Sequence, residues 1–168
     1  MKKISLLFCL SFVSSFVLAN AYIDGDIGLN TTWSSLGLSA DAGYLFNRYF
    51  ALEGGLTYSP GYSYSWTPGS SYSSSYWMID AAAKGILPLS DVFALYGKLG
   101  IGFNNYSSWS SNTCNGCSGP EYSGTNIGIL YGIGGKFNLS SQWSLHVEDY
   151  TVTGPNPNFL MFGAEFRF

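Results

Sequence analysis

The sequence predicts an all-β protein, an eight-stranded antiparallel up-and-down transmembrane β-barrel. Three observations lead to this fold class. Eight segments alternate apolar and polar residues with a period of two, the pattern of a strand with one apolar and one polar face. Aromatic residues make up 18% of the chain and charged residues only 10%, whereas about 25% of residues are charged in an average soluble domain. After the first 21 residues, no apolar run approaches the roughly 20 residues that a membrane helix needs.

The N-terminal residues 1–21 have the layout of a secretory signal peptide. Two lysines precede an apolar core, Ile4 to Leu18, and the small residues that follow offer a cleavage site after Ala21. We therefore expect residues 22–168 to form a single transmembrane barrel domain. No cysteine follows the small residues, which argues against a lipoprotein. Acidic residues outnumber basic ones and no basic run occurs, so nucleic acid is not an expected partner.

The first three predicted strands cover residues 22–30, 36–46 and 50–59. In each, apolar residues fall on one parity and polar residues on the other. Asn47 and Arg48 make a tight reversal, and Pro60 with Gly61 ends the third strand. The residues expected to face outward are Ile23, Ile27, Leu29, Leu36, Leu38, Ala40, Ala42, Tyr44, Phe50, Leu52, Leu56 and Tyr58. Those expected to face inward are Asp24, Asp26, Asn30, Ser39, Asp41, Gly43, Glu53 and Thr57.

The next three predicted strands cover residues 76–87, 92–104 and 125–139. A short turn after Leu87 joins the first two, and Ser/Tyr-rich segments at 60–75 and 105–124, which lack a buried pattern, are expected to be long loops. The outward set is Trp77, Ile79, Ala81, Ala83, Leu87, Phe93, Leu95, Leu99, Ile101, Phe103, Ile127, Ile129, Tyr131, Ile133, Phe137 and Leu139. The inward set is Asp80, Ala82, Lys84, Tyr96, Lys98, Asn126, Lys136 and Asn138.

The seventh predicted strand, residues 143–152, begins with regular alternation and then conflicts with it. Strict alternation would put Asp149 into lipid, where a charge is costly. We therefore expect a β-bulge at Glu148 and Asp149 that turns both acids inward and returns Tyr150 and Val152 to the lipid face.

The eighth predicted strand, Asn158 to Phe168, ends the sequence on an aromatic residue. Its alternate positions are apolar, and Gly163, Glu165 and Arg167 lie between them. Three tight turns, near residues 47, 89 and 141, alternate with four other links, two of them long, an asymmetry typical of transmembrane barrels.

The chain resembles the OmpA-like transmembrane barrel family of small outer-membrane proteins. The residues that carry the resemblance are Gly43–Asn47, Ala51–Glu53, Ala83–Leu89, Tyr96–Gly100, Glu148 and Phe168. The resemblance implies a location in the bacterial outer membrane, with lipid around the barrel. It also implies that the last strand, with Phe162, Phe166 and Phe168, is the tag that the barrel-insertion machinery reads. The sequence lacks the peptidoglycan-binding domain of full-length members, so no wall-anchoring role is expected.

Inward-facing charges are the first candidate functional group. The interior of an eight-stranded barrel is just filled by side chains, and buried charges must be paired. We expect an ionic network that plugs the lumen; its members are Glu53, Lys84, Lys98, Lys136, Glu148, Glu165 and Arg167. The alternative is a narrow, gated pore.

His146 raises the hypothesis of a lipid A-modifying barrel enzyme. Ser144, His146 and Glu148 share the inward face, but neighbours two apart on a strand lie about 7 Å from each other, too far for a catalytic triad. We expect an ordinary lumen histidine and no catalytic residue.

Cys114 and Cys117 lie in the longest expected loop, separated by Asn115 and Gly116. Exported proteins fold in an oxidising compartment, and Asn-Gly favours a tight turn, so we expect a small disulfide loop. Neither a βαβ context for redox chemistry nor further metal ligands accompany the pair. No cofactor or metal is expected.

The Ser/Tyr-rich segments 60–75 and 105–124 are the remaining candidates. Tyrosine offers contact area and serine offers adaptable hydrogen bonds, as in antibody recognition loops. The function expected is a structural outer-membrane barrel, and recognition of a host or surface ligand is one reading of these loops. The alternative for the loops is a soluble, variable coat without a partner.

Overall fold

The computed structural model describes residues 20–61, 64–67, 70–111, 122–154 and 156–168. Most of the predicted signal peptide and both Cys114 and Cys117 lie outside this range, so signal cleavage and the disulfide stay predictions. In the described part of the chain, no helix is long and apolar enough to cross a membrane. The strands are β1 Ala21–Asn30, β2 Ser35–Asn47, β3 Phe50–Pro60, β4 Tyr64–Thr67, β5 Ser70–Pro88, β6 Phe93–Ser111, β7 Tyr122–Asn138, β8 Trp143–Val152 and β9 Asn158–Arg167.

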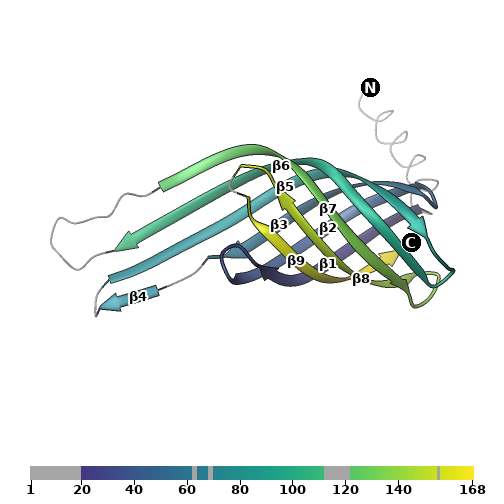
Figure 1. Ribbon diagram of the computed structural model, residues 1–168, viewed down its shortest axis with the longest axis horizontal. Coiled ribbons are helices and arrows are strands. Elements are labelled where there is room, and N and C mark those ends of the chain that lie inside the picture. The colour runs from purple at the N-terminus through teal and green to yellow at the C-terminus, as the bar shows by residue number, and fades with distance from the viewer. Residues whose placement is uncertain (1–19, 62–63, 68–69, 112–121, 155) are drawn as a thin grey trace, which may run out of the picture.

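Eight of these strands close into an antiparallel barrel. Each of β1, β2, β3, β5, β6, β7, β8 and β9 pairs with its neighbours along the chain, and β1 pairs with β9 to complete the ring. The predicted fold class is confirmed. The short β4 pairs with β5 and adds a hairpin beyond the ring (Figure 1). Three short connections lie at one end, here called the turn end, and the opposite end is called the hairpin end.

Three strands are much longer than the others. A tilted strand of about 9 to 11 residues crosses a membrane, and β1, β8 and β9 have 10 residues each. In contrast, β5 and β6 have 19 residues each and β7 has 17. Their additional residues, together with β4, form a sheet that projects from the hairpin end (Figure 1). This sheet is called the β4–β7 extension below.

The extension corrects the prediction that residues 60–75 and 105–124 are long loops. Much of each segment is strand, and the pairing of β5 with β6 continues through Ser75↔Ser107 to Ser71↔Ser111. The hydroxyls of Ser75 and Ser107 lie 2.8 Å apart across the two strands. Sequence periodicity could not detect these strands because neither lipid nor a core imposes an apolar face on them.

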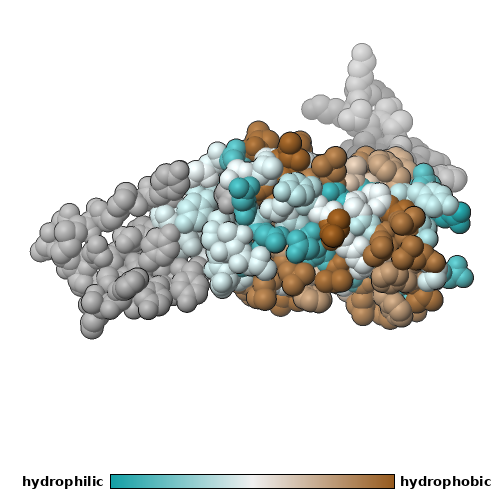
Figure 2. Space-filling model, viewed as in Figure 1, coloured by the Kyte–Doolittle hydropathy of each residue, from teal (hydrophilic) through white to brown (hydrophobic). Residues whose placement is uncertain are grey.

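The barrel wall has an apolar outer side. Large hydrophobic side chains on alternating positions are exposed around the barrel, among them Ile27 at 56%, Leu99 at 63% and Ile133 at 72%. Figure 2 shows hydrophobic residues gathered over the barrel body on the face in view. The opposite parity carries buried polar and charged side chains. The facing of the predicted strands therefore agrees with their alternation through β7.

The predicted β-bulge in β8 is wrong. Pairing is unbroken on both sides of the strand: Asp149 is opposite Ile133 on β7 and opposite Leu160 on β9. Asp149 consequently lies on the outer, exposed side, whereas Tyr150 and Val152 are buried in the lumen. Two continuous ladders of backbone hydrogen bonds keep the parity of the strand, which outweighs the cost of one outward carboxylate.

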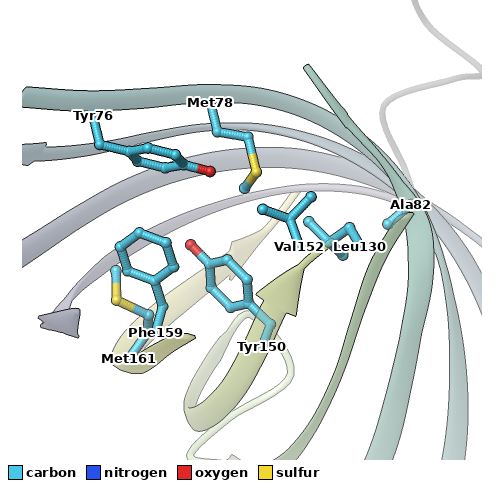
Figure 3. Close-up of a cluster of buried hydrophobic side chains, with 8 residues drawn as sticks. All are labelled: Tyr76, Met78, Ala82, Leu130, Tyr150, Val152, Phe159 and Met161. Atoms are coloured by element: carbon cyan, nitrogen blue, oxygen red, sulfur yellow. The ribbon is translucent and has the colours of Figure 1, made fainter. Parts of the chain in front are cut away.

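An apolar cluster fills the lumen towards the hairpin end (Figure 3). Tyr150 stacks on Phe159 with ring centroids 5.2 Å apart, and Phe159 also lies 5.7 Å from the ring of Tyr76. Trp33, in the turn between β1 and β2, packs on the cluster. Its members come from β5, β7, β8 and β9: Tyr76, Met78, Ala82, Leu130, Tyr150, Val152, Phe159 and Met161.

Candidate functional site

Four buried charges from four different strands meet inside the barrel. Glu53 on β3 contacts both Lys84 on β5, at 2.6 Å, and Lys98 on β6, at 2.5 Å. Lys98 also donates a hydrogen bond to Glu148 on β8, at 2.7 Å. All four side chains are at least nine-tenths buried. These charges, called the central group below, tie β3, β5, β6 and β8 together across the lumen.

Aromatic rings complete the surroundings of the central group. The hydroxyl of Tyr22 donates to Glu53 Oε2 at 2.7 Å. Lys84 Nζ lies 4.6 Å from the ring centre of Tyr96, close enough for a cation–π interaction. Lys98 Nζ lies 5.3 Å from the ring centre of Tyr150. Each lysine thus has both a carboxylate and an aromatic neighbour, so its charge is compensated where water is scarce.

Glycines on the neighbouring strands make room for these rings. Tyr22 lies opposite Gly43, and Tyr96 lies opposite Gly134. A Cβ atom added at Gly43 would lie 2.2 Å from Cζ of Tyr22, and one at Gly134 would lie 2.3 Å from Cζ of Tyr96. The rings therefore cover the glycine backbone, an arrangement that also protects a strand weakened by glycine.

A second group of charges lies apart from the first. Lys136 on β7 contacts both oxygens of Glu165 on β9, each at 3.1 Å. Arg167 reaches the same carboxylate at 3.0 Å, with a side chain that is 31% exposed. Within the described part of the chain, no ion pair joins this second group to the central group. The expected single network of seven residues is therefore divided into two groups.

His146 engages acids from β1, not the partners that a catalytic triad would need. Its Nε2 lies 2.7 Å from Asp26 Oδ1 and 3.6 Å from Asp24 Oδ2. Ser144 donates to Asn138 Oδ1 at 3.0 Å, and Glu148 binds Lys98. The three residues of the triad hypothesis thus make contacts with three different strands.

His146 and the two acids of β1 are also the group best placed to hold a metal ion among the described residues. The ligand atoms of Asp24, Asp26 and His146 lie within 4.8 Å of one another. In the described structure, His146 Nε2 and Asp26 Oδ1 share a hydrogen bond at 2.7 Å. Gly163 leaves the space for it, because a Cβ there would lie 1.8 Å from Asp26 Oδ1.

The three aromatic residues of the predicted insertion tag, Phe162, Phe166 and Phe168, lie on the outer side of the barrel wall, opposite in parity to the buried Phe159. Phe162 and Phe168 are 56% and 50% exposed. Phe166 lies between Trp143, at 5.0 Å, and Phe168, at 5.4 Å. Their recognition by the insertion machinery stays a prediction.

Sequence reasoning did not identify Tyr22 and Tyr150 as lumen residues. The sequence contained a signal for both. Tyr22 has the same parity as the inward-facing Asp24, and Tyr150 has the same parity as the inward-facing Glu148. Tyr150 lies opposite Gly132, as Tyr22 lies opposite Gly43 and Tyr96 lies opposite Gly134. This pairing needs the register of neighbouring strands, which alternation alone does not supply.

Comparison with known proteins agrees with this architecture. Residues 11–168 match the family described as "Outer membrane protein beta-barrel domain". No curated protein matches the chain by sequence. Among solved structures, Ail of Yersinia pestis is similar with a TM-score of 0.59 and 17% identity, over 89% of this chain and 97% of that chain.

Two further solved structures are similar over 89% of this chain. The N-terminal β-barrel domain of Pseudomonas aeruginosa OprF has a TM-score of 0.64 and 12% identity, over 98% of its own chain. Neisserial surface protein A has a TM-score of 0.62 and 14% identity, over 95% of its own chain. At these identities the similarity shows the fold.

Proposed function

Because this chain belongs to the outer-membrane β-barrel domain family, we propose that it is a closed barrel that displays the β4–β7 extension at the cell surface to recognise a surface ligand. Membership confirms the family resemblance of its motifs. A member of this family resides in the bacterial outer membrane.

The direction of the barrel follows from its connections. Outer-membrane barrels have short turns on the periplasmic side and longer connections outside. Here the turns between β2 and β3, between β5 and β6 and between β7 and β8 share one end with the two ends of the described barrel. The β4–β7 extension projects from the opposite end and thus points away from the cell.

One contrast carries the proposal: the inside of the barrel is occupied by side chains, whereas its outer end is enlarged. The central group, the second group and the apolar cluster place buried side chains along the lumen. A barrel with this interior is suited to holding a structure in the membrane, not to passing solutes. The residues beyond the membrane-spanning length of β5, β6 and β7 would have no role in a bare anchor.

The composition of the extension indicates which ligands it suits. Residues 60–75 contain no charged residue, and residues 105–124 contain only Glu121. Ail has been solved in complex with sucrose octasulfate, a heparin analogue. A polyanion of that kind would find no cation on this extension. Tyrosine and serine favour uncharged partners held by ring contacts and hydrogen bonds.

Cell binding tests the proposal. A Gram-negative strain expresses the wild type or a variant in which 62–73 and 107–123 are each replaced by an Asn-Gly turn. We expect wild-type cells to bind epithelial cells or immobilised extracellular matrix several-fold better than cells with the shortened variant. A variant with residues 62–73 in scrambled order separates sequence from length. Equal binding by wild-type and shortened barrels would refute the recognition role.

A further inference from the structure

A pocket of about 400 Å³ lies at the hairpin end of the barrel, beside the apolar cluster. Small-molecule sites typically measure about 300 to 1,000 Å³, so this pocket suits a ligand of one or two rings. Its walls come from β6, β7 and the turns after β1 and β8. The lining residues are Trp33, Asn104, Tyr106, Gly124, Thr125, Asn126 and Gly154.

One wall of the pocket is aromatic and held in place. Trp33 lies 5.5 Å from the ring of Tyr106 and 5.5 Å, edge to face, from the ring of Tyr76. Its backbone N–H donates to Asn30 Oδ1 at 3.2 Å, which fixes the turn that carries it. Aromatic faces carry a partial negative charge. They therefore attract the weakly positive C–H groups on the flat side of a sugar ring.

The lining of the pocket also includes two amides, Asn104 and Asn126. Asn104 is 1% exposed, and its Nδ2 has no hydrogen-bond partner within the described structure. A buried donor without a partner costs free energy, so a ligand acceptor would be favourable here. Because Nδ2 is closed to solvent, the Asn104 amide must turn toward the pocket to meet such an acceptor. The side chain of Asn126 lies against Gly154 in the turn after β8. A Cβ atom added at Gly154 would lie 2.0 Å from Asn126 Nδ2, and the φ of Gly154 is 109°. Only glycine permits this approach.

The charge of the lining selects the ligand class. None of the seven lining residues carries a charge. An anionic group placed here would lose water without gaining a cation, which is unfavourable. A hydrophobic ligand would leave Asn104 Nδ2 without a partner.

We propose that the pocket binds a neutral sugar unit. The ring stacks on the aromatic wall of Trp33 and Tyr106, and a hydroxyl or acetamido oxygen accepts from Asn104 Nδ2 once the amide turns toward the pocket. The proposal rests on the proposed function, because it requires the hairpin end to face outward.

Glycan binding by the purified, full barrel in detergent micelles tests the pocket. The probes are printed neutral glycans, together with sulfated and sialylated glycans on the same array. We expect binding to neutral glycans, reduced at least ten-fold by Trp33→Ala and by Asn104→Leu. Trp77→Ala is the matched control, because Trp77 is another tryptophan at this end that packs on Phe103 of the outer face; it should bind like the wild type.

Every variant is first checked for the heat-dependent change in SDS mobility of a folded barrel. No neutral binding, binding of anionic glycans alone, or full binding by both pocket variants would overturn the proposal.

Cell binding separates this proposal from the proposed function. If the shortened extension abolishes adhesion but Trp33→Ala and Asn104→Leu leave adhesion and glycan binding intact, the pocket proposal fails and the recognition role stands. If the shortened extension leaves adhesion unchanged while the purified barrel binds neutral glycans through Trp33, the recognition role fails and the pocket stands.

Discussion

Lys84 on β5 and Lys98 on β6 are direct cross-strand partners, and both ammonium groups contact the carboxylate of Glu53. Like charges opposite each other destabilise a sheet. Here one buried acid on a third strand compensates both cations, and Glu148 adds a further negative charge beside Lys98. The stability of the barrel should therefore depend strongly on Glu53.

Replacing Glu53 with alanine should lower the free energy of unfolding by about 3 to 5 kcal/mol, because it leaves two buried cations facing each other. Urea-induced unfolding from lipid vesicles, followed by tryptophan fluorescence, measures the loss. Asp91→Ala, which removes an acid from an exposed turn, should change stability by less than about 0.5 kcal/mol. A loss below about 1 kcal/mol for Glu53→Ala would contradict the role given to this residue.

Glu165→Ala should act independently of Glu53→Ala, because the second group makes no ion pair with the central group in the described structure. The losses of the two single variants should add in the double variant within about 0.5 kcal/mol. Glu53→Ala and Glu148→Ala, which share Lys98, should deviate from additivity by more than that. Strong coupling between Glu53 and Glu165 would instead indicate one network.

Two glycines of β6 should respond differently to alanine. A Cβ at Gly100 would lie 2.2 Å from the backbone oxygen of Ala81, whereas at Gly97 the nearest atom, on Gly132, is 3.9 Å away. We expect Gly100→Ala to cost about 1 to 3 kcal/mol through overpacking. Gly97→Ala should be neutral or slightly stabilising, because alanine restricts the unfolded chain. Equal effects in the same unfolding experiment would show that β5 does not approach β6 this closely at Gly100.

Asp149→Val should stabilise the barrel in a bilayer. Asp149 is an exposed carboxylate on the outer wall, between Ile133 and Leu160, and outward charges near the membrane midplane are unfavourable. The expected gain is about 1 to 2 kcal/mol, measured by unfolding from vesicles. A loss of stability would indicate that the carboxylate has a partner in the membrane or faces the lumen.

Sequence alternation predicted the strands and their facing well because lipid on one side and a narrow lumen on the other impose a period of two. It assigned Lys84, Lys98 and Glu53 correctly to the interior. It could not tell which charges meet, since contacts across the lumen depend on strand order and tilt. The division between the central group and the Lys136–Glu165 pair is a result of that geometry.

The errors have separate physical causes. The predicted bulge in β8 rests on the cost of a charge in lipid and neglects the backbone hydrogen bonds to both neighbouring strands. It therefore places Tyr150 and Val152 on the wrong face. Near Ser75 and Ser107 the strands extend beyond the barrel ring, so the alternation of their side chains no longer indicates which face is buried. The pocket at Trp33 and Asn104 joins residues distant in sequence, and no local motif marks it.

Planar-bilayer conductance of the purified barrel tests most directly whether the lumen is closed, the condition on which a display role depends. With the central group and the apolar cluster in place, the wild type should show no large, steady openings. Large, steady openings of the wild type would contradict a filled lumen, and the barrel would then be a pore whose extension guards its entrance.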